Sequence, residues 1–190
     1  MERVEYGAKG GTPIRQKTKR LAHRLHQIIG AIRCESHPVH AKETYTVSTE
    51  QNKAAVRRYW EGFNAHNLDI WDEVCTPNHM NHDPGLPVPD ADLQTIKQLI
   101  GGLQAAFPDV KSSEEDLIAE GDKVVVRRTF RATHKGEFMG VAATGKGVTF
   151  SGIFIDRLTG GKIEEQWVAF DVMGLMIQIG AVPAPGQGGS

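Results

Sequence analysis

The stretch Gly161-Lys-Ile-Glu-Glu-Gln-Trp-Val-Ala-Phe-Asp-Val-Met173 alternates between two sets of side chains, as a β-strand does. Side chains two residues apart share one face of a sheet. Trp167 and Asp171 therefore fall on one face, and Val168 and Phe170 fall on the other. We expect this stretch to be the last long strand of the fold and to direct Trp167 and Asp171 to the same side.

Asp171 is the candidate acid/base of this strand. A carboxylate that follows Trp167 on a largely apolar strand loses hydration when it is buried, which disfavours the charged form and raises its pKa. A carboxyl group with a raised pKa can exchange protons near neutral pH. The pattern thus favours Asp171 as the acid/base of a closed pocket. The alternative is a solvated or ion-paired residue at the end of a strand.

Length and composition indicate one soluble globular domain with appendages. The chain has 190 residues, of which 39% are hydrophobic and 24% are charged. No apolar run approaches the roughly 20 residues that cross a bilayer, so we expect no membrane span and a cytoplasmic protein. Cys34 and Cys75 form no metal or redox motif, and two free thiols are the simplest interpretation.

Charge divides the chain into a basic leader and an acidic body. Residues 1–45 hold nine Lys or Arg and four Asp or Glu, a net charge of +5, whereas the remainder holds thirteen and nineteen, a net charge of −6. An acidic body argues against a nucleic-acid groove. We expect residues 1–46 to be largely disordered, with one amphipathic helix over 17–33 that could bind a membrane surface or serve in targeting.

The leader has a third interpretation, in which translation begins at Val47 and residues 1–46 are not native. The composition changes at that point, and some start codons otherwise encode valine. The domain is then expected to occupy residues 47–180. A Pro- and Gly-rich tail over 181–190 is predicted to be disordered.

Periodicity predicts helices first and strands afterwards. Apolar residues at helical spacing predict helices over 48–65, 68–74 and 90–107, and alternation predicts strands over 110–120, 123–134 and 148–158 before the final strand. Within 123–134 the alternation places Arg128, Phe130 and His134 on the inner face. Helices followed by antiparallel strands are typical of the α+β class.

Two short motifs are set aside. His79 and His82 lie beside Asp83, but residues three apart on a strand face opposite ways and no third ligand has a supporting spacing, so no metal site is predicted. We expect His82 to line the pocket and His79 to lie outside it. The segment 140–147 nearly matches a phosphate-binding loop, but Gly147 replaces the required Ser or Thr and a strand follows instead of a helix.

Several segments, in the same order over roughly 48–180, resemble the SnoaL-like polyketide cyclase (ester cyclase) family of the nuclear-transport-factor-2-like (NTF2-like) superfamily. They are Ser48-Thr-Glu-Gln-Asn-Lys53, His82-Asp-Pro84, Phe107-Pro-Asp109, Glu120-Gly-Asp-Lys-Val124, Thr133-His-Lys-Gly-Glu-Phe-Met-Gly140, Thr144-Gly-Lys146, Gly161-Lys-Ile163, and Trp167 with the segment from Asp171 to Gly180. The chain departs from the family at Gln166, where His is usual, and at Ala142-Ala143, where Pro is usual before Thr144.

The resemblance implies an α+β cone in which three N-terminal helices pack on a strongly curved antiparallel sheet. It implies a cofactor-free cyclase that closes a ring by intramolecular aldol chemistry on a small polyketide-like carbonyl substrate. Asp171 matches the family's general acid/base, and His82 and His134 match pocket positions. The remaining candidate substrate-binding residues are Trp167, Arg128, Phe63, Trp60 and Phe130.

Three functions remain open from the sequence, because a fold does not by itself establish an activity. The first is the cyclase, the second is an isomerase or hydratase in the same pocket, and the third is a non-catalytic protein that binds an apolar ligand. We expect no metal and no nucleic-acid partner. We expect a homodimer or a larger homo-oligomer, because an open sheet face is usually covered and the resemblance implies self-association.

Overall fold

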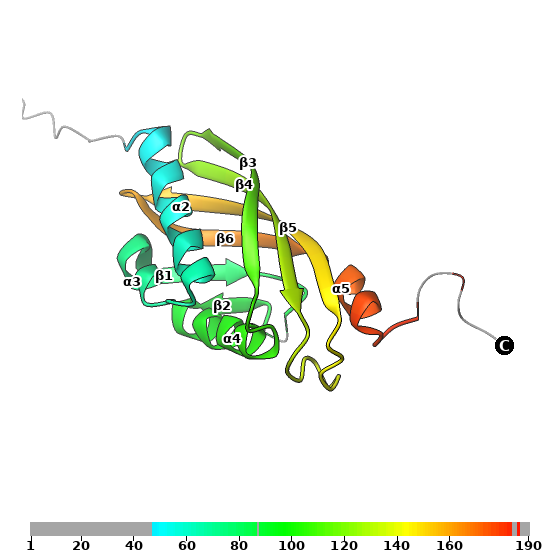
Figure 1. The fold of residues 1–190 in the computed structure, drawn as a ribbon. Helices are drawn as coiled ribbons and strands as arrows, with labels where there is room; N and C mark the ends of the chain where they lie inside the picture. The colour runs from blue at the N-terminus through cyan, green and yellow to red at the C-terminus, as the bar shows by residue number, and fades with distance from the viewer. Residues whose placement is uncertain (1–46, 87, 184–185, 187–190) are drawn as a thin grey trace, which may run out of the picture. The chain divides into compact units, whose positions relative to one another are not determined.

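The computed structural model describes residues 47–86, 88–183 and 186 (Figure 1). The predictions for residues 1–46 and for most of the tail therefore lie outside the described residues. In the described part, the helices are α2 (Thr49–Ala65), α3 (Ile70–Val74), α4 (Leu93–Ala106) and α5 (Val172–Ile179). The strands are β1 (Cys75–His82), β2 (Asp90–Asp92), β3 (Lys111–Glu120), β4 (Lys123–Thr133), β5 (Gly147–Thr159) and β6 (Lys162–Phe170). None of the described helices is both long and apolar enough to traverse a bilayer.

Capping residues set the ends of the first long helix. Ser48 caps α2 by accepting a hydrogen bond from the Gln51 backbone N–H at 3.2 Å, and the Gln51 side chain accepts one from the Ser48 N–H at 2.8 Å. His66 ends the helix in the left-handed conformation, with φ 56°. The helices predicted over 48–65, 68–74 and 90–107 correspond to α2, α3 and α4, with ends that differ by at most three residues.

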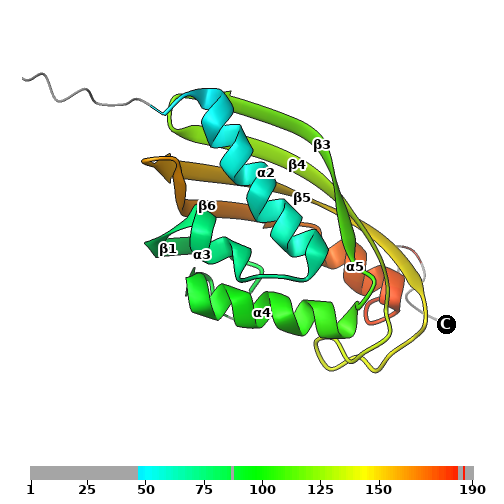
Figure 2. The same cartoon turned by 60° about the vertical axis from the view of Figure 1, so that its left-hand side comes forward.

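The described strands form one sheet in the order β2-β1-β6-β5-β4-β3, and helix α2 lies across one of its faces (Figures 1 and 2). The resemblance implied an antiparallel sheet, and the observed sheet is mixed because one of its strand pairs is parallel. Strand β1 runs parallel to β6, with Met80 opposite Glu165 and His82 opposite Trp167. Strands this far apart in sequence can pair in parallel because α4 and four intervening strands supply the long return connection. The fold is α+β with a mixed sheet.

The last strand is shorter than predicted, and a helix follows it. Strand β6 ends at Phe170, and the Asp171 side chain accepts a hydrogen bond from the Gly174 N–H at 2.8 Å, which starts α5. Gly180 ends α5 with φ 89°. Asp171 is thus the N-cap of a helix, where the sequence alone suggested a continuing strand.

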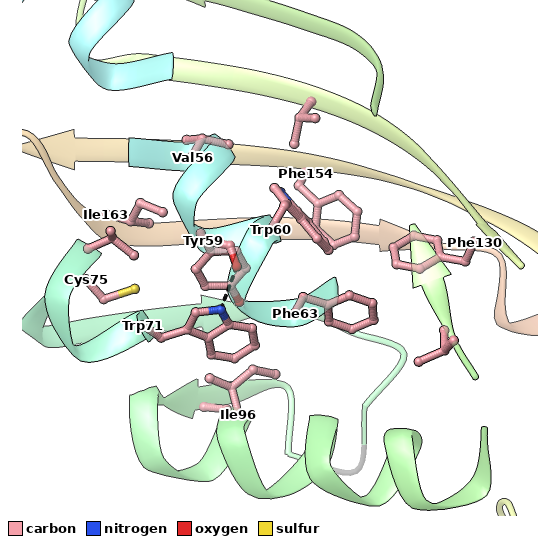
Figure 3. Close-up of a cluster of buried hydrophobic side chains, with 14 of the residues drawn as sticks. Val56, Tyr59, Trp60, Phe63, Trp71, Cys75, Ile96, Phe130, Phe154 and Ile163 are labelled. Atoms are coloured by element: carbon pink, nitrogen blue, oxygen red, sulfur yellow. Dashed lines mark hydrogen bonds between the residues drawn. The ribbon is translucent and has the colours of Figure 1, made fainter. Parts of the chain in front are cut away.

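An aromatic core lies between α2 and the inner face of the sheet, as Figure 3 shows. The ring of Tyr59 stacks on Trp71 at a centroid distance of 4.1 Å, and Trp60 meets Phe154 edge-on at 4.6 Å. Offset-stacked and edge-on pairs of this kind favour one arrangement of the rings. The core therefore holds α2 and α3 in a fixed position above the sheet.

Gly136 lets the loop after β4 dock against the end of α4. The backbone N–H groups of Lys135 and Gly136 both donate to the Ala106 carbonyl at 2.9 Å. A Cβ atom at position 136 would lie 2.7 Å from the Ala105 carbonyl oxygen and 2.9 Å from the Ala106 Cα. We expect Gly136→Ala to lower the free energy of unfolding by about 2–3 kcal/mol in urea titrations, because the clash is with backbone atoms that cannot rotate away.

Gly101→Ala provides the matched control in the interior of α4. A Cβ atom there has no neighbour within 4 Å. Alanine should raise the free energy of unfolding by about 0.5–1 kcal/mol because glycine is a poor helix former. Similar effects of the two substitutions would contradict the assigned role of Gly136.

Candidate active-site cavity

A cavity of about 340 Å³ lies between α2, α4 and the inner face of the sheet. The size and the apolar wall suit a small, largely apolar molecule. Aromatic side chains from α2, α3, β4, β5 and β6 form much of the wall. They are Trp60, Phe63, Trp71, Phe130, Phe154 and Phe170.

A few polar side chains also line this wall. They are Tyr59 on α2, Asn81 at the end of β1, Asp83 in the following loop, Glu137 in the loop after β4, and Gln166 on β6. Asn81 and Gln166 are both buried, with exposed fractions of 2% each. Such convergent polar groups in an apolar cavity can orient a ligand and interact with one reactive part of it.

A chain of hydrogen bonds connects the cavity wall to a carboxyl group behind it. The Asn81 Nδ2 atom donates to Gln166 Oε1 at 2.8 Å, and Gln166 Nε2 donates to Asp156 Oδ1 at 2.7 Å. Asp156 pairs directly with Gln166 across β5 and β6, and it shares the inner face with Phe154, which lines the cavity. The residue borders the floor of the cavity without being part of its accessible wall.

Burial dominates the electrostatics of Asp156. Its side chain has an exposed fraction of 0%, and burial raises its pKa from 3.8 to about 7, while the hydrogen bond from Gln166 lowers the pKa in part. The Oδ2 atom has no hydrogen-bond partner among the described residues. Asp156 is therefore a carboxyl group that gains and loses a proton near neutral pH, which is the property required of a general acid/base.

Asp83 is a second carboxyl group and lies in the cavity wall itself. The residue is 8% exposed, and its Oδ1 atom accepts a hydrogen bond from the Gly85 N–H at 2.9 Å. Burial raises the pKa of Asp83, whereas the hydrogen bond from Gly85 lowers it. Asp83 also borders a depression on the opposite face of the sheet, so it stands between the cavity and the outside.

Asp171 does not lie in this cavity, contrary to the expectation from the sequence. Its side chain is exposed, caps α5 and borders the outer depression together with Arg127 and Ala169. Trp167 also faces outward and stacks on His82 at a centroid distance of 5.6 Å. The parity of β6 is the reverse of the one assumed, because the cavity is lined by Gln166, Val168 and Phe170.

His82 is held on the outer face by two carboxylates. Its Nδ1 atom lies 2.7 Å from Asp90 Oδ1, and its Nε2 atom lies 3.0 Å from Glu165 Oε1. The hydrogen bond with Asp90 raises the pKa of His82 the most, and the bond with Glu165 adds to it. The expectation that His82 lines the pocket was therefore wrong, and His79 is the buried member of the pair at 1% exposure.

His134 and Arg128 are buried but do not line the cavity. His134 Nδ1 lies 3.0 Å from Thr144 Oγ1, and its ring stacks on Phe107 at 5.1 Å. Arg128 lies over the Trp60 ring at 4.5 Å. Its Nε atom donates to Ser112 Oγ at 3.1 Å. These contacts fix the loop after β4 and strand β3, and neither residue is part of the cavity wall.

Trp60, Phe63 and Phe130 do line the cavity, and their contact with a substrate stays a prediction. Sequence reasoning did not single out Asp156. Its signal was nevertheless present, because Asp156 continues the apolar alternation of Phe150, Phe154 and Leu158 along β5. The criterion applied to Asp171, a carboxylate on the apolar face of a strand, applies more directly to Asp156.

Within the described residues, no three His, Cys, Asp or Glu side chains are grouped so that they could hold a metal ion. His79 and His82 point to opposite faces of β1, as their spacing predicts.

The chain belongs to the SnoaL-like polyketide cyclase family, whose model matches residues 53–179. Among solved structures it is similar to AclR from Streptomyces galilaeus, a candidate hydroxylase, with 28% identity and a TM-score of 0.66 over 72% of this chain and 85% of that one. It is also similar to IdmH from Streptomyces antibioticus, a candidate polyketide cyclase, with 29% identity and a TM-score of 0.63 over 68% of this chain and 99% of that one. The comparison with curated proteins found no match. The fold is thus NTF2-like, as the sequence led us to expect.

Proposed function

We propose that the protein is a cofactor-independent cyclase that closes a ring in a small polyketide-like substrate, with Asp156 as the general acid/base. The single observation that carries this proposal is a buried carboxyl group, with a pKa of about 7, that lies behind the wall of an apolar cavity and is hydrogen-bonded to Gln166 in that wall. The family membership and the similarity to IdmH support the reaction class. The role first expected of Asp171 passes to Asp156 in this proposal.

The proposed reaction moves one proton out and one proton back. The Asp156 carboxylate removes a proton from a carbon that lies between two carbonyl groups, and the electrons of that C–H bond pass into an enolate. The enolate carbon forms a bond to a second carbonyl carbon of the same molecule. The resulting alkoxide then takes the proton from Asp156, so that the product is a cyclic isomer of the substrate.

The amides of Asn81 and Gln166 support this chemistry from the cavity wall. Each amide nitrogen carries two hydrogens, and the hydrogen bonds within the chain use one of each. The second hydrogens are free to approach a carbonyl oxygen of the substrate. Fixed donors of this kind stabilise negative charge without reorganising during the reaction.

A linear aryl poly-β-ketone tests the proposal, because its cyclic aldol product has the same mass but a different chromatographic retention time. We expect the protein to accelerate ring closure above the buffer background between pH 7 and 8. Binding of the probe without any acceleration across pH 6–9 would refute the cyclase proposal. Added chelator should leave the rate unchanged, because the proposed steps use protein groups only.

The alternative is a protein that holds an apolar ligand or performs a different proton transfer, such as isomerisation or hydration. The complete burial of Asp156 favours simple binding, because a substrate must displace part of the cavity floor to reach the carboxyl group. Mass spectrometry of ligands that co-purify with the protein distinguishes the cyclase from a protein that only binds an apolar ligand. A ligand without an acidic carbon would favour the binding protein.

Self-association of the chain stays a prediction. The outer face of the sheet presents Ile153 and Ile155, which are 46% and 37% exposed, close to Trp167. Apolar side chains on an open sheet face support a second copy of this chain as the partner. Light scattering of the purified protein tests this, and a monomer at micromolar concentration would contradict it.

A further inference from the structure

The end of β1 brings an ionisable side chain to the cavity wall. Asp83 directly follows β1, and its backbone N–H donates to the Pro89 carbonyl at 2.8 Å, so the chain stays extended there. Side chains two residues apart share one face of a strand, which places Asp83 on the side of Asn81, a lining residue, and opposite to the outward-facing His82. Asp83 accordingly lines the cavity.

The carboxyl group of Asp83 is packed among other residues of the cavity wall. Its Oδ1 atom accepts a hydrogen bond from the Gly85 N–H at 2.9 Å. A Cβ atom at position 85 would lie 3.1 Å from this Oδ1 atom and 3.4 Å from Val172 Cγ2. Because Gly85 and Val172 both line the cavity, these contacts place the carboxyl group itself at the wall.

The carboxyl group of Asp83 has few partners for its degree of burial. The residue is 8% exposed, and among the described residues the Gly85 N–H is the sole hydrogen-bond donor to its side chain. Arg127 borders the same outer depression as Asp83 but pairs with Asp116 at 2.7 Å. An ionised carboxylate has roughly four acceptor sites, so a ligand that donates a hydrogen bond would replace hydration that burial removes.

The described residues that line the cavity include no Lys, Arg or His to balance this charge. Their acidic members are Asp83, which is buried, and Glu137, which is exposed. A buried charge is screened less by water and salt than an exposed one, so Asp83 has the larger effect on a bound molecule. The wall therefore favours a ligand whose polar end is neutral or cationic and disfavours an anion.

We infer that Asp83 is the specificity-determining residue of the cavity, whose carboxylate accepts a hydrogen bond from a hydroxyl or ammonium group of the ligand and repels a carboxylate at the same position. The inference rests on the proposed function where it takes this ligand to be the substrate, and it specifies a carbonyl compound with a hydrogen-bond donor at one end. A buried polar group discriminates well, because a ligand without the donor leaves it unpaired.

Four naphthalenes with different polar ends test the inference without any turnover, and the fluorescence of their shared ring reports binding. We expect the wild type to bind 2-naphthylmethylamine and 2-naphthol more tightly than 2-methylnaphthalene, and 2-naphthoate least tightly. Asp83→Asn should weaken binding of the amine about 10- to 100-fold, the usual effect of losing a hydrogen bond to a charged group, and should strengthen binding of 2-naphthoate. Binding of 2-methylnaphthalene should change by less than about 2-fold, because it has no polar end.

Asp171→Asn is the matched control, because it removes the same charge from an exposed position outside the cavity and should change binding of every probe by less than about 2-fold. Asparagine at position 83 can still accept the hydrogen bond from Gly85, and unchanged binding of 2-methylnaphthalene confirms that the cavity is intact.

Two results would overturn the inference. Equal weakening of all four probes by Asp83→Asn would show that Asp83 only supports the structure of the loop. An unchanged preference for the amine over 2-naphthoate would show that the carboxylate serves the outer depression instead of the cavity. A preference that Asp83→Asn removes, in a protein that does not cyclise the poly-β-ketone, would support the role of Asp83 while refuting the cyclase.

Discussion

Replacement of Asp156 by asparagine is expected to lower the rate of ring closure of a poly-β-ketone probe by about 10²- to 10⁴-fold. Asparagine has nearly the same shape, and its side-chain oxygen can still accept the hydrogen bond that Gln166 donates to Asp156 Oδ1 at 2.7 Å. The variant loses only the ability to take up and return a proton. Initial rates measured by chromatography, with the fold checked by circular dichroism, give the result.

The pH profile gives the same prediction a second readout. A general base must be ionised, and the pKa of Asp156 is raised to about 7, so the wild-type kcat/KM should rise as pH increases through about 7. The residual rate of Asp156→Asn should lack this step. A wild-type step near pH 4 would assign the base to a carboxyl group with an ordinary pKa and would contradict the role of Asp156.

The variant Asp171→Asn tests whether Asp171 or Asp156 is the general acid/base. Asp171 is exposed and caps α5, and asparagine is an equally good N-cap, so this variant should retain activity within about 3-fold. If Asp171→Asn loses turnover while Asp156→Asn keeps it, the expectation from the sequence was right and the assignment of Asp156 is wrong. A comparison of the two variants therefore shows which of the two carboxyl groups is the general acid/base.

Local signals predicted most of the fold. Ser48 and Asp92 cap α2 and α4 within two residues of the predicted helix starts, and the alternation of β4 and β5 places Phe130 and Phe154 inside. The parallel pairing of β1 with β6 was not predictable in the same way. It joins residues more than 80 positions apart, and no local pattern records which neighbour a short strand takes.

The site was predicted less well because it depends on the parity of one strand. Glu165, Trp167 and Asp171 form as plausible an inner set as Gln166, Val168 and Phe170, since each combines polar and apolar side chains. The pairing of Gln166 with Asp156 decides the matter, and it is a long-range contact. The cap at Asp171 was equally hidden, because the strand pattern continues through Val172 without a break.

The stability of the protein should depend on the same carboxyl group, with the opposite sign to its activity. The unfolded chain loses the proton of Asp156 near pH 4, whereas the folded protein keeps it until about pH 7. Between these values the folded state binds more protons, so the free energy of unfolding falls as pH rises. The total loss amounts to about 4 kcal/mol by pH 8, because the pKa rises from 3.8 to about 7 and each pKa unit corresponds to about 1.4 kcal/mol.

Asp156→Asn removes this dependence, since asparagine stays neutral and introduces no buried charge at any pH. We expect the variant and the wild type to have similar free energies of unfolding below pH 4, and the variant to be more stable by about 4 kcal/mol at pH 8. Urea titrations at pH 4, 6 and 8 measure the difference. Asp116→Asn is the control, because Asp116 is exposed and pairs with Arg127 at 2.7 Å, a contact worth at most about 1 kcal/mol.

Parallel stability curves for Asp156→Asn and the wild type would show that Asp156 does not carry a raised pKa, and the proposed acid/base role would lose its physical basis. A variant that is less stable at every pH, including pH 4 where Asp156 is neutral, would show instead that asparagine does not replace the carboxyl group in its buried hydrogen bond with Gln166. The expected result, a more stable and less active protein above pH 7, has one cause. The burial that raises the pKa of Asp156 destabilises the fold once the group ionises, and the same burial brings its proton exchange into the neutral range.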